Sequence, residues 1–455
     1  MATEVQGVLR GRNVVDGRPA TLGLLVSLVL VVVAFALPPL LGWDVAPRRD
    51  ELSAAPLHGY WDPKVGPGTL PAVALALLAV WRAETWALQW SWWRLLPVSY
   101  IAALAWLLAL ALVDGPSGLT RAMAQPSEYL FTARQVDDVG VMLSTYVDRI
   151  PYAHPDNWPT HVAGHPPGAV LMFIGLVALG FGSDLATALV VIALAASMPA
   201  AVMVTLRTRG AERSARLVAP FLVLSPAAVF MAVSADAVFT VIAAWGLAAL
   251  AGAGMARRGP RMVALAVLAG LLLGWCVMSS YGLPLLGTLA VAVLVLARAW
   301  WPLPIAVASA LAVVLGFATA GFAWWEAYPV LVERYWDGIA SDRPASYWTW
   351  GNLAALLVCA GPLLGAGLAN AVALGRERSD RSVRTVVVLV SAAALAVFAA
   401  DMSQMSKAEV ERIWLPFVPW LTLSLALLPP GWRRGGLVLH VATALVVQHV
   451  LYTSW

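Results

Sequence analysis

The sequence predicts an all-α integral membrane protein with about 13 transmembrane helices, and three observations support this fold class. First, 61% of the 455 residues are hydrophobic and only 12% are charged, whereas soluble domains carry about 25% charged residues. Second, the hydrophobic residues form blocks of about 20, the length that crosses a hydrocarbon core of about 30 Å. Third, the basic residues are concentrated in short segments on alternate sides of these blocks.

The first apolar block, residues 22–41, is too long for the core of a signal peptide and lacks a clear cleavage site, so we expect a retained helix. Hydropathy places the spans at 21–42, 70–84, 96–113, 184–206, 214–231, 236–255, 261–279, 283–299, 303–323, 350–375, 384–401, 413–430 and 436–452. Residues 168–182 are also apolar, but they are short and follow Pro166 and Pro167. We therefore expect a juxtamembrane or re-entrant helix there.

The charge distribution supports that choice. With the N-terminus in the cytoplasm, most of the 29 basic residues fall on short cytoplasmic loops, as the positive-inside rule requires. If 168–182 crossed the membrane, every later loop would change sides and the cluster Arg207–Arg216 would face outward. Most of the acidic residues fall on the outer side instead, which indicates a functional outer face.

We expect residues 1–455 to form a single polytopic transmembrane domain with no separate soluble domain. Its outer loops are 43–69, 114–183, 324–349 and 402–412. The C-terminus is expected outside.

The outer loop 114–183 carries the densest group of chemically useful side chains. It begins at Asp114, continues through Glu128, and contains three histidines within twelve residues before two prolines, namely His154, His161 and His165. The simplest alternatives are a helix cap for Asp114, an exposed loop acid for Glu128 and a rigid turn at His165. Carboxylates accept protons and histidines donate hydrogen bonds, so a reaction site at the membrane surface is the functional reading.

A second charged segment, 401–412, lies between two spans. Its candidate residues are Lys407, Glu409, Glu411 and Arg412. Glu409 and Arg412 share a face of a short helix at i,i+3 spacing. Ionisable residues that enter a span are functional candidates, although a surface ion pair of less than about 1 kcal/mol is the alternative. Asp236, at the outer end of another span, is costly there unless it faces water or a partner.

These motifs and their order resemble the GT-C superfamily of membrane glycosyltransferases, which transfer sugars from polyprenyl-phosphate carriers on the extracytoplasmic face. The resemblance covers residues 96–255 best. It rests on Asp114 and Glu128 early in a long outer loop, His165-Pro166-Pro167 at its close, the arginine-rich turn 207–216, Leu224-Ser225-Pro226, and Ser234-Ala235-Asp236. The 402–412 turn is similar to one in actinobacterial arabinofuranosyl- and mannosyltransferases. The sequence departs from the family in having two spans before the loop and no adjacent acidic pair at its start.

The resemblance implies a GT-C-like bundle with extracytoplasmic juxtamembrane helices and an inverting glycosyl transfer to a cell-envelope glycan or glycolipid. Asp114 or Glu128 would be the base that deprotonates the acceptor hydroxyl. The leaving phosphate needs positive charge or hydrogen-bond donors, for which we expect His161, His165, Lys407 and Arg412. Asp236, Glu409 and Glu411 complete the expected substrate-binding residues.

We expect the protein in a bacterial plasma membrane, with the lipid bilayer, a polyprenyl-phosphate sugar donor and a glycan acceptor as partners, and no nucleic acid. The outer acids are compatible with a divalent metal, but no ligand spacing requires one, so no metal ligand is assigned. Two alternatives stay open. A transporter or flippase predicts acids buried at mid-membrane, and a non-catalytic envelope-assembly subunit predicts that Asp114, Glu128 and His165 do not converge.

Overall fold

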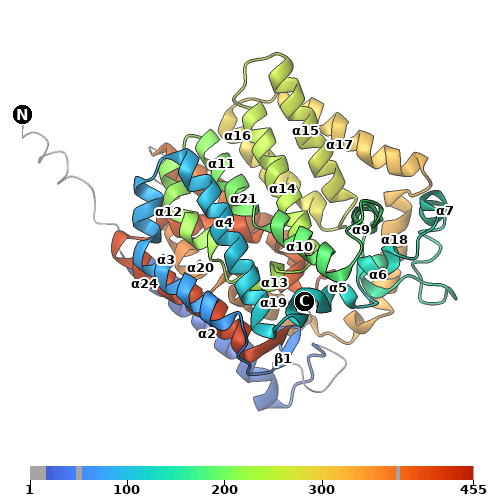
Figure 1. The fold of residues 1–455 in the computed structure, drawn as a ribbon, viewed down its shortest axis with the longest axis horizontal. Coiled ribbons are helices and arrows are strands. Elements are labelled where there is room, and N and C mark those ends of the chain that lie inside the picture. Colours follow the sequence, from blue (N-terminus) through green and yellow to red (C-terminus); the bar gives the residue numbers. More distant parts are fainter. Residues whose placement is uncertain (1–16, 48–53, 376–379, 454–455) are drawn as a thin grey trace, which may run out of the picture.

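The structure is a computed structural model that describes residues 17–47, 54–375 and 380–453. The expected cytoplasmic N-terminus (1–16), part of the outer loop 43–69 (48–53) and part of a basic loop (376–379) lie outside the described residues. The elements form a bundle of long helices with short helices gathered at one end (Figure 1).

Eight helical segments of the described chain are long and apolar enough to cross a membrane, so the protein is a multi-pass membrane protein of the all-α class. The uninterrupted ones are α2 (Arg18–Leu41), α3 (Thr69–Gln89), α14 (Ala235–Ala253), α15 (Pro260–Val277), α17 (Pro302–Thr319) and α21 (Arg381–Met402). The others are α4 (Trp92–Ala111) with η1 (Leu112–Asp114), and α10 (Asp184–Ala195) with α11 (Met198–Thr208). The expected number of 13 is not confirmed.

The remaining expected spans are broken or short. Residues 350–375 belong to α19 (Ala345–Ala360) and α20 (Leu363–Leu374), which bend by 103° at Gly361-Pro362. Residues 214–231 divide into α12 (Glu212–Val223) and α13 (Ala228–Met231), with Pro226 between them. Residues 413–430 form α22 (Val410–Ile413), α23 (Val418–Thr422) and η4 (Leu423–Leu427) instead of one helix. Proline removes a backbone donor and blocks the preceding turn, so Pro416 and Pro419 explain the last break.

Two other expected spans differ at their ends. Residues 283–299 form the shorter pair η2 (Leu283–Leu286) and α16 (Gly287–Ala297). The last helix, α24 (Pro430–Val450), gives way to strand β2 (Leu451–Thr453), which pairs antiparallel with β1 (Gly59–Trp61). The segment 168–182 contains α9 (Gly168–Ala178), which at 1.5 Å per residue is about 16 Å long and too short to cross.

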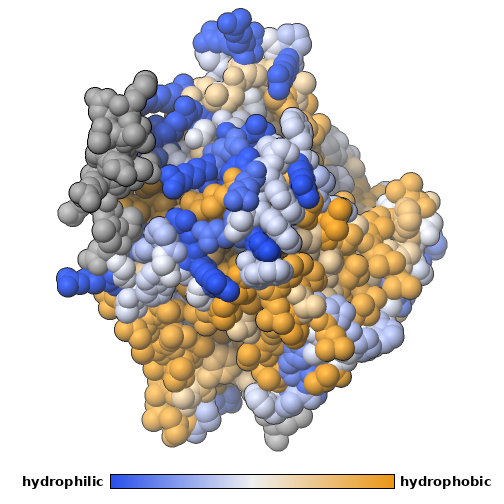
Figure 2. All heavy atoms as spheres, turned by 60° about the vertical axis from the view of Figure 1, so that its left-hand side comes forward, coloured by the Kyte–Doolittle hydropathy of each residue, from blue (hydrophilic) through white to orange (hydrophobic). Residues whose placement is uncertain are grey.

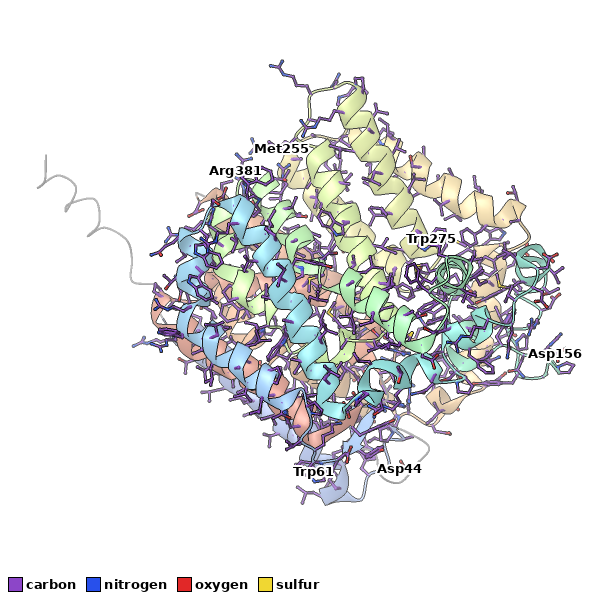
Figure 3. The ribbon with its side chains drawn as sticks, viewed as in Figure 1. Asp44, Trp61, Asp156, Met255, Trp275 and Arg381 are labelled. Atoms are coloured by element: carbon purple, nitrogen blue, oxygen red, sulfur yellow. The ribbon has the colours of Figure 1, made fainter. Side chains whose placement is uncertain are left out.

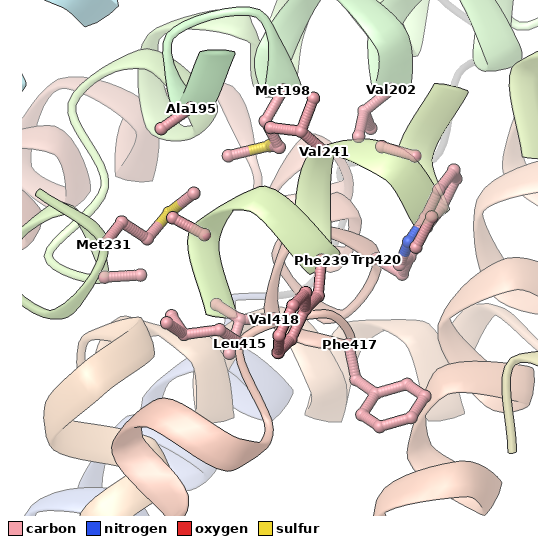
Figure 4. Packing of buried hydrophobic residues seen from close by; sticks show 14 of the residues in the cluster. Ala195, Met198, Val202, Met231, Phe239, Val241, Leu415, Phe417, Val418 and Trp420 are labelled. Atoms are coloured by element: carbon pink, nitrogen blue, oxygen red, sulfur yellow. The ribbon is translucent and has the colours of Figure 1, made fainter. Parts of the chain in front are cut away.

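Small residues allow the long helices to pack closely. A Cβ atom on Gly365 of α20 would lie 2.5 Å from the carbonyl oxygen of Gly23 in α2. A Cβ on Gly270 of α15 would likewise lie 2.2 Å from the carbonyl oxygen of Ala306 in α17. In lipid, the hydrophobic effect does not drive helices together, and close van der Waals packing at small residues stabilises their association instead. Bulky side chains fill the centre, where Phe239 of α14 and Leu415, Val418 and Trp420 belong to one buried cluster (Figure 4).

The loops meet at two opposite ends of the bundle. In Figure 3, Met255 and Arg381 mark one end, and Asp44 and Trp61 mark the other. At the first, the arginine-rich end, Arg216 donates to the carbonyl oxygens of Ala87 and Trp90, both at 2.8 Å. Figure 2 shows hydrophilic residues gathered over the upper part of the molecule, above a mainly hydrophobic surface.

The second end, the carboxylate end, contains Glu128, Asp236, Glu409 and Glu411. It gathers short helices from the expected outer loops: α5 (Ser117–Ala124), α6 (Tyr129–Ala133), α7 (Val139–Ser144), α8 (Thr160–Ala163), α18 (Trp324–Trp336) and η3 (Ile339–Ser341). The loops that the charge pattern assigns to one side therefore lie together.

Candidate functional site

Arg412 is the centre of the candidate site, and its side chain is almost fully buried. Its Nη1 donates to Oε1 of Glu128 at 2.9 Å. Its Nε lies 3.2 Å from Oδ2 of Asp236, and its Nη2 lies 2.8 Å from Nδ1 of His161. One guanidinium from α22 thus joins residues that are 284, 251 and 176 positions away in sequence (412 − 128, 412 − 161 and 412 − 236).

Helix starts position both carboxylates. Glu128 is the extended residue that precedes α6. Asp236 is the second residue of α14, where Ser234 caps the helix by accepting from the amide of Ala237 at 3.2 Å. The partial positive charge at a helix N-terminus favours an anionic side chain. Asp236 therefore lies in the first turn of its helix.

The charges of this group stabilise one another. Burial alone would raise the pKa of Glu128, but His161 and Arg412 together lower that pKa below its ordinary value. Burial opposes the charge of Arg412 as well, yet the surrounding carboxylates raise the pKa of its guanidinium. Glu128 is therefore an ionised acceptor and Arg412 a fixed cation.

The two histidines of the predicted site are adjacent, but burial lowers their pKa values, that of His165 to about 4. Nδ1 of His165 lies 2.9 Å from the carbonyl oxygen of His161. Nε2 of His161 lies 3.5 Å from Oε1 of Glu128. Nδ1 of His161 accepts from Arg412, because a guanidinium can only donate. With a pKa of about 4, His165 is neutral at physiological pH and offers hydrogen bonds but no charge.

Glu409 and Glu411 lie beside this group and meet a residue that the sequence did not single out, His58. Oε1 of Glu409 lies 3.7 Å from Nδ1 of His58 and 3.7 Å from Nη2 of Arg343. The backbone amide of His58 donates to Oε1 of Glu411 at 2.8 Å. Burial opposes ionisation of both acids. At Glu409, the effect of His58 and Arg343 is larger than that of burial, and the pKa falls to about 2. At Glu411, burial is the larger effect, and the pKa rises to about 7.

The loop that presents Glu409 has an unusual backbone. Gln404, Ala408 and Glu409 all have φ between 57° and 65°, the left-handed region that non-glycine residues rarely adopt. Asn352 of α19 holds the loop, since its amide donates to Asp401 at 2.8 Å and its oxygen accepts from the amide of Ala408 at 3.1 Å. Backbone strain that surrounding contacts maintain is typical of functional sites.

Lys407 and Arg343 connect the loops of this end. Nζ of Lys407 donates to the carbonyl oxygen of Arg343 at 2.9 Å and lies 4.5 Å from the ring centre of Trp336. The Arg343 guanidinium donates to the carbonyl oxygens of Ala46, Pro47 and Lys407. The predicted phosphate ligand Lys407 thus also has a structural role.

Asp114 lies in a different network. Its carboxylate is 2.9 Å from Nζ of Lys64 and 3.5 Å from Nη2 of Arg121, and it accepts from Nε2 of Gln448 at 2.6 Å. These contacts join the end of α4 to the end of α24. The structure therefore brings Glu128, His161, His165, Asp236, Glu409, Glu411 and Arg412 together, and places Asp114 elsewhere.

A cavity of about 480 Å³ opens beside Arg412 and the side chains that contact it. Its ionisable lining residues include His161, His165, Lys407, Glu409 and Arg412. Its lining does not include Glu128, Asp236 or Glu411. The cavity also has an aromatic wall, formed by Tyr281, Trp324, Tyr328 and Tyr335. Trp324 and Tyr328 are stacked with ring centres 5.3 Å apart.

The cavity can accept an anionic group and a flat polar ring, since it combines cations, an ionised carboxylate and aromatic faces. No group of three His, Cys, Asp or Glu within the described ranges is arranged to hold a metal ion. No sequence pattern indicates His58, Arg343 or Asn352, because their roles depend on contacts between segments far apart in the chain.

No family model and no curated protein matches the sequence. Among solved structures, the chain is similar to an oligosaccharyltransferase of Archaeoglobus fulgidus that was crystallised in complex with zinc and sulfate. The two are 13% identical with a TM-score of 0.45, and the match covers 78% of this chain. The chain spans about half the length of that protein, 51%. A likeness of this size does not establish a shared activity.

Proposed function

We propose that the protein is a membrane glycosyltransferase that moves a sugar from a polyprenyl-phosphate donor to a cell-envelope acceptor by an inverting reaction. One observation carries the proposal: a cavity at the carboxylate end combines the ionised Glu409, the guanidinium of Arg412 and an aromatic wall. A lipid-linked donor reaches such a cavity from the membrane, with its phosphate near Arg412 and its sugar against the aromatic wall.

The charge balance of the site suits this chemistry. Glu128, Asp236 and Glu409 surround Arg412, so three carboxylates lie around one guanidinium. Glycosyl transfer develops positive charge at the anomeric carbon, and carboxylates close to that carbon stabilise it. The acceptor hydroxyl attacks as the bond to the phosphate oxygen breaks, its proton passes to a carboxylate, and the lipid phosphate leaves with the electron pair.

We propose Glu409 as the base, because it lines the cavity and is ionised over the whole physiological pH range. Glu128 lies behind Arg412 and His161 and positions both side chains. The prediction that Asp114 or Glu128 is the base stays open to the same experiment.

The test is transfer of radiolabelled sugar from a panel of polyprenyl-phosphate donors, including arabinofuranose and mannose, by the purified protein. Glu409→Gln, Glu128→Gln and Asp114→Asn are matched isosteric variants. Transfer by the wild type that only Glu409→Gln abolishes, with donor binding retained, supports the assignment. Undiminished transfer by Glu409→Gln refutes it, and no transfer with any donor refutes the proposed activity.

The transporter alternative fits the described contacts less well. It requires acids at mid-membrane, whereas Asp236 begins α14 and Glu128 precedes α6. Transport of a lipid-linked sugar across proteoliposomes, without transfer to an acceptor, would favour it.

A further inference from the structure

A second cavity lies at the arginine-rich end, between α3, α12 and α24, and shares no lining residue with the cavity beside Arg412. Its volume is about 190 Å³. Glu84, Thr85, Arg433 and Arg434 contribute its polar lining, and Leu217 and Phe221 are among its apolar lining residues. The cavity thus has a charged part and an apolar part.

The charged part has more cations than its carboxylate can neutralise. Nη1 of Arg433 lies 3.2 Å from Oε1 of Glu84. Nε of Arg433 is buried, and no hydrogen-bond partner for it exists within the described ranges. Arg434 is exposed and forms no recorded ion pair with any described residue. Trp81, which also lines the cavity, has the Arg82 guanidinium 4.0 Å from its ring centre.

An anion is therefore the complementary ligand. Two guanidinium groups favour phosphate oxygens, which they contact through paired N–H donors. The apolar part and the membrane-spanning α3 favour a ligand that also carries hydrocarbon. Basic pockets between helices at the membrane surface are typical sites for lipid headgroups.

We propose that this cavity binds the headgroup of an anionic phospholipid. Its phosphate lies against Arg433 and Arg434, and its glycerol and first acyl carbons cover Leu217 and Phe221. Glu84 competes with the lipid phosphate for Arg433 and so limits its affinity. This site is independent of the proposed glycosyl transfer.

The experiment uses the full chain, delipidated in detergent and titrated with phosphatidylglycerol or phosphatidylcholine of identical acyl chains. Native mass spectrometry measures the lipids retained. We expect phosphatidylglycerol to be retained about tenfold better. The double variant Arg433→Gln/Arg434→Gln is expected to lose this preference. Glu84→Gln is expected to increase it, a gain that misfolding cannot produce.

Arg258→Gln is the matched control, because Arg258 is a basic residue whose guanidinium packs 3.9 Å from the ring centre of Trp301, away from the cavity lining. It is expected to keep the preference. Equal retention of the two lipids by the wild type would overturn the proposal. So would an unchanged double variant, an equal loss in Arg258→Gln, or displacement of the lipid by millimolar glycerol phosphate, which would assign the site to soluble phosphates.

Discussion

Two ion clusters at the same end of the bundle have opposite charge balance. In one cluster, the carboxylate of Asp114 contacts two cations, Lys64 and Arg121. In the other, the guanidinium of Arg412 contacts two carboxylates, Glu128 and Asp236. Only Arg412 lines the large cavity, whereas Asp114 does not. The position of an acid in a loop therefore does not by itself identify a catalytic residue. The excess of charge and the contact with a cavity distinguish the two clusters.

The largest expected effect separates the clusters by activity. Glu409→Gln should lower the rate of sugar transfer by about 10²–10⁴-fold, the usual contribution of a general base. Glu128→Gln should lower it less, because this side chain acts through Arg412 and His161. Asp114→Asn should leave the rate within about threefold, since base catalysis does not involve it. A large loss of rate in Asp114→Asn, in protein of normal thermal stability, would reverse the functional ranking of the clusters.

The next effect is on stability. Arg412→Met leaves two buried carboxylates unpaired and should lower the free energy of unfolding by about 3–5 kcal/mol. The triple variant Arg412→Met/Glu128→Leu/Asp236→Leu should regain much of this stability, because replacing the whole buried network with apolar side chains removes the unpaired charges. Thermal unfolding in detergent, followed by tryptophan fluorescence, measures both.

The triple variant should remain inactive. Recovery of stability without activity would show that the network serves function more than folding. A triple variant as unstable as Arg412→Met would contradict the charge argument.

A smaller loss is expected at the other cluster. Asp114→Asn keeps the shape but removes the charge that Lys64 and Arg121 contact, so stability should fall by about 1–3 kcal/mol. The double variant Asp114→Asn/Lys64→Met should regain part of the lost stability. The measurement is the unfolding temperature of the single and double variants. Equal stability of Asp114→Asn and the wild type would mean that this cluster is solvated and dispensable.

The last effect is a pH dependence of stability that arises from Glu411. Its pKa in the folded protein, about 7, lies above the ordinary value of 4.5. Its contribution to stability is therefore fully present below about pH 4.5 and is lost as the pH rises through about 7. Between pH 5.5 and pH 8 the wild type should lose about 2 kcal/mol more than Glu411→Gln does. Parallel unfolding curves for the two proteins across this range would exclude a raised pKa.

Composition and block length were enough to predict an all-α membrane protein, because the hydrocarbon core imposes the same length on every span. Loops that the charge pattern assigns to one side are joined by contacts such as those of Arg343 with Ala46 and Lys407. The number of spans was less predictable, since Pro226, Pro362 and Pro416 divide apolar blocks that hydropathy alone treats as continuous. A block such as 413–430 is apolar because it is buried in the bundle, with Trp414 and Trp420 in the core.

The candidate site was predictable in its residue types but not in its pairing. Arg412 and Glu409 were selected because charge before an apolar helix is unusual, and Glu128 because it lies in a long outer loop. The partners of Glu409, His58 and Arg343, belong to loops without any recognisable motif. Periodicity describes neighbours along a helix, and it carries no information on which distant loops meet.

The short strand pair has a consequence for biosynthesis. Strand β2 holds β1 through pairs such as Tyr60 with Tyr452, and the loop that carries β1 supplies His58 to Glu409 and Glu411. Residues 59–61 can therefore pair with β2 only after residues 451–453 have left the ribosome. A nascent chain arrested before that point lacks this strand pair. The contacts of His58 with Glu409 and Glu411 would therefore form only when nearly all of the described chain has been inserted.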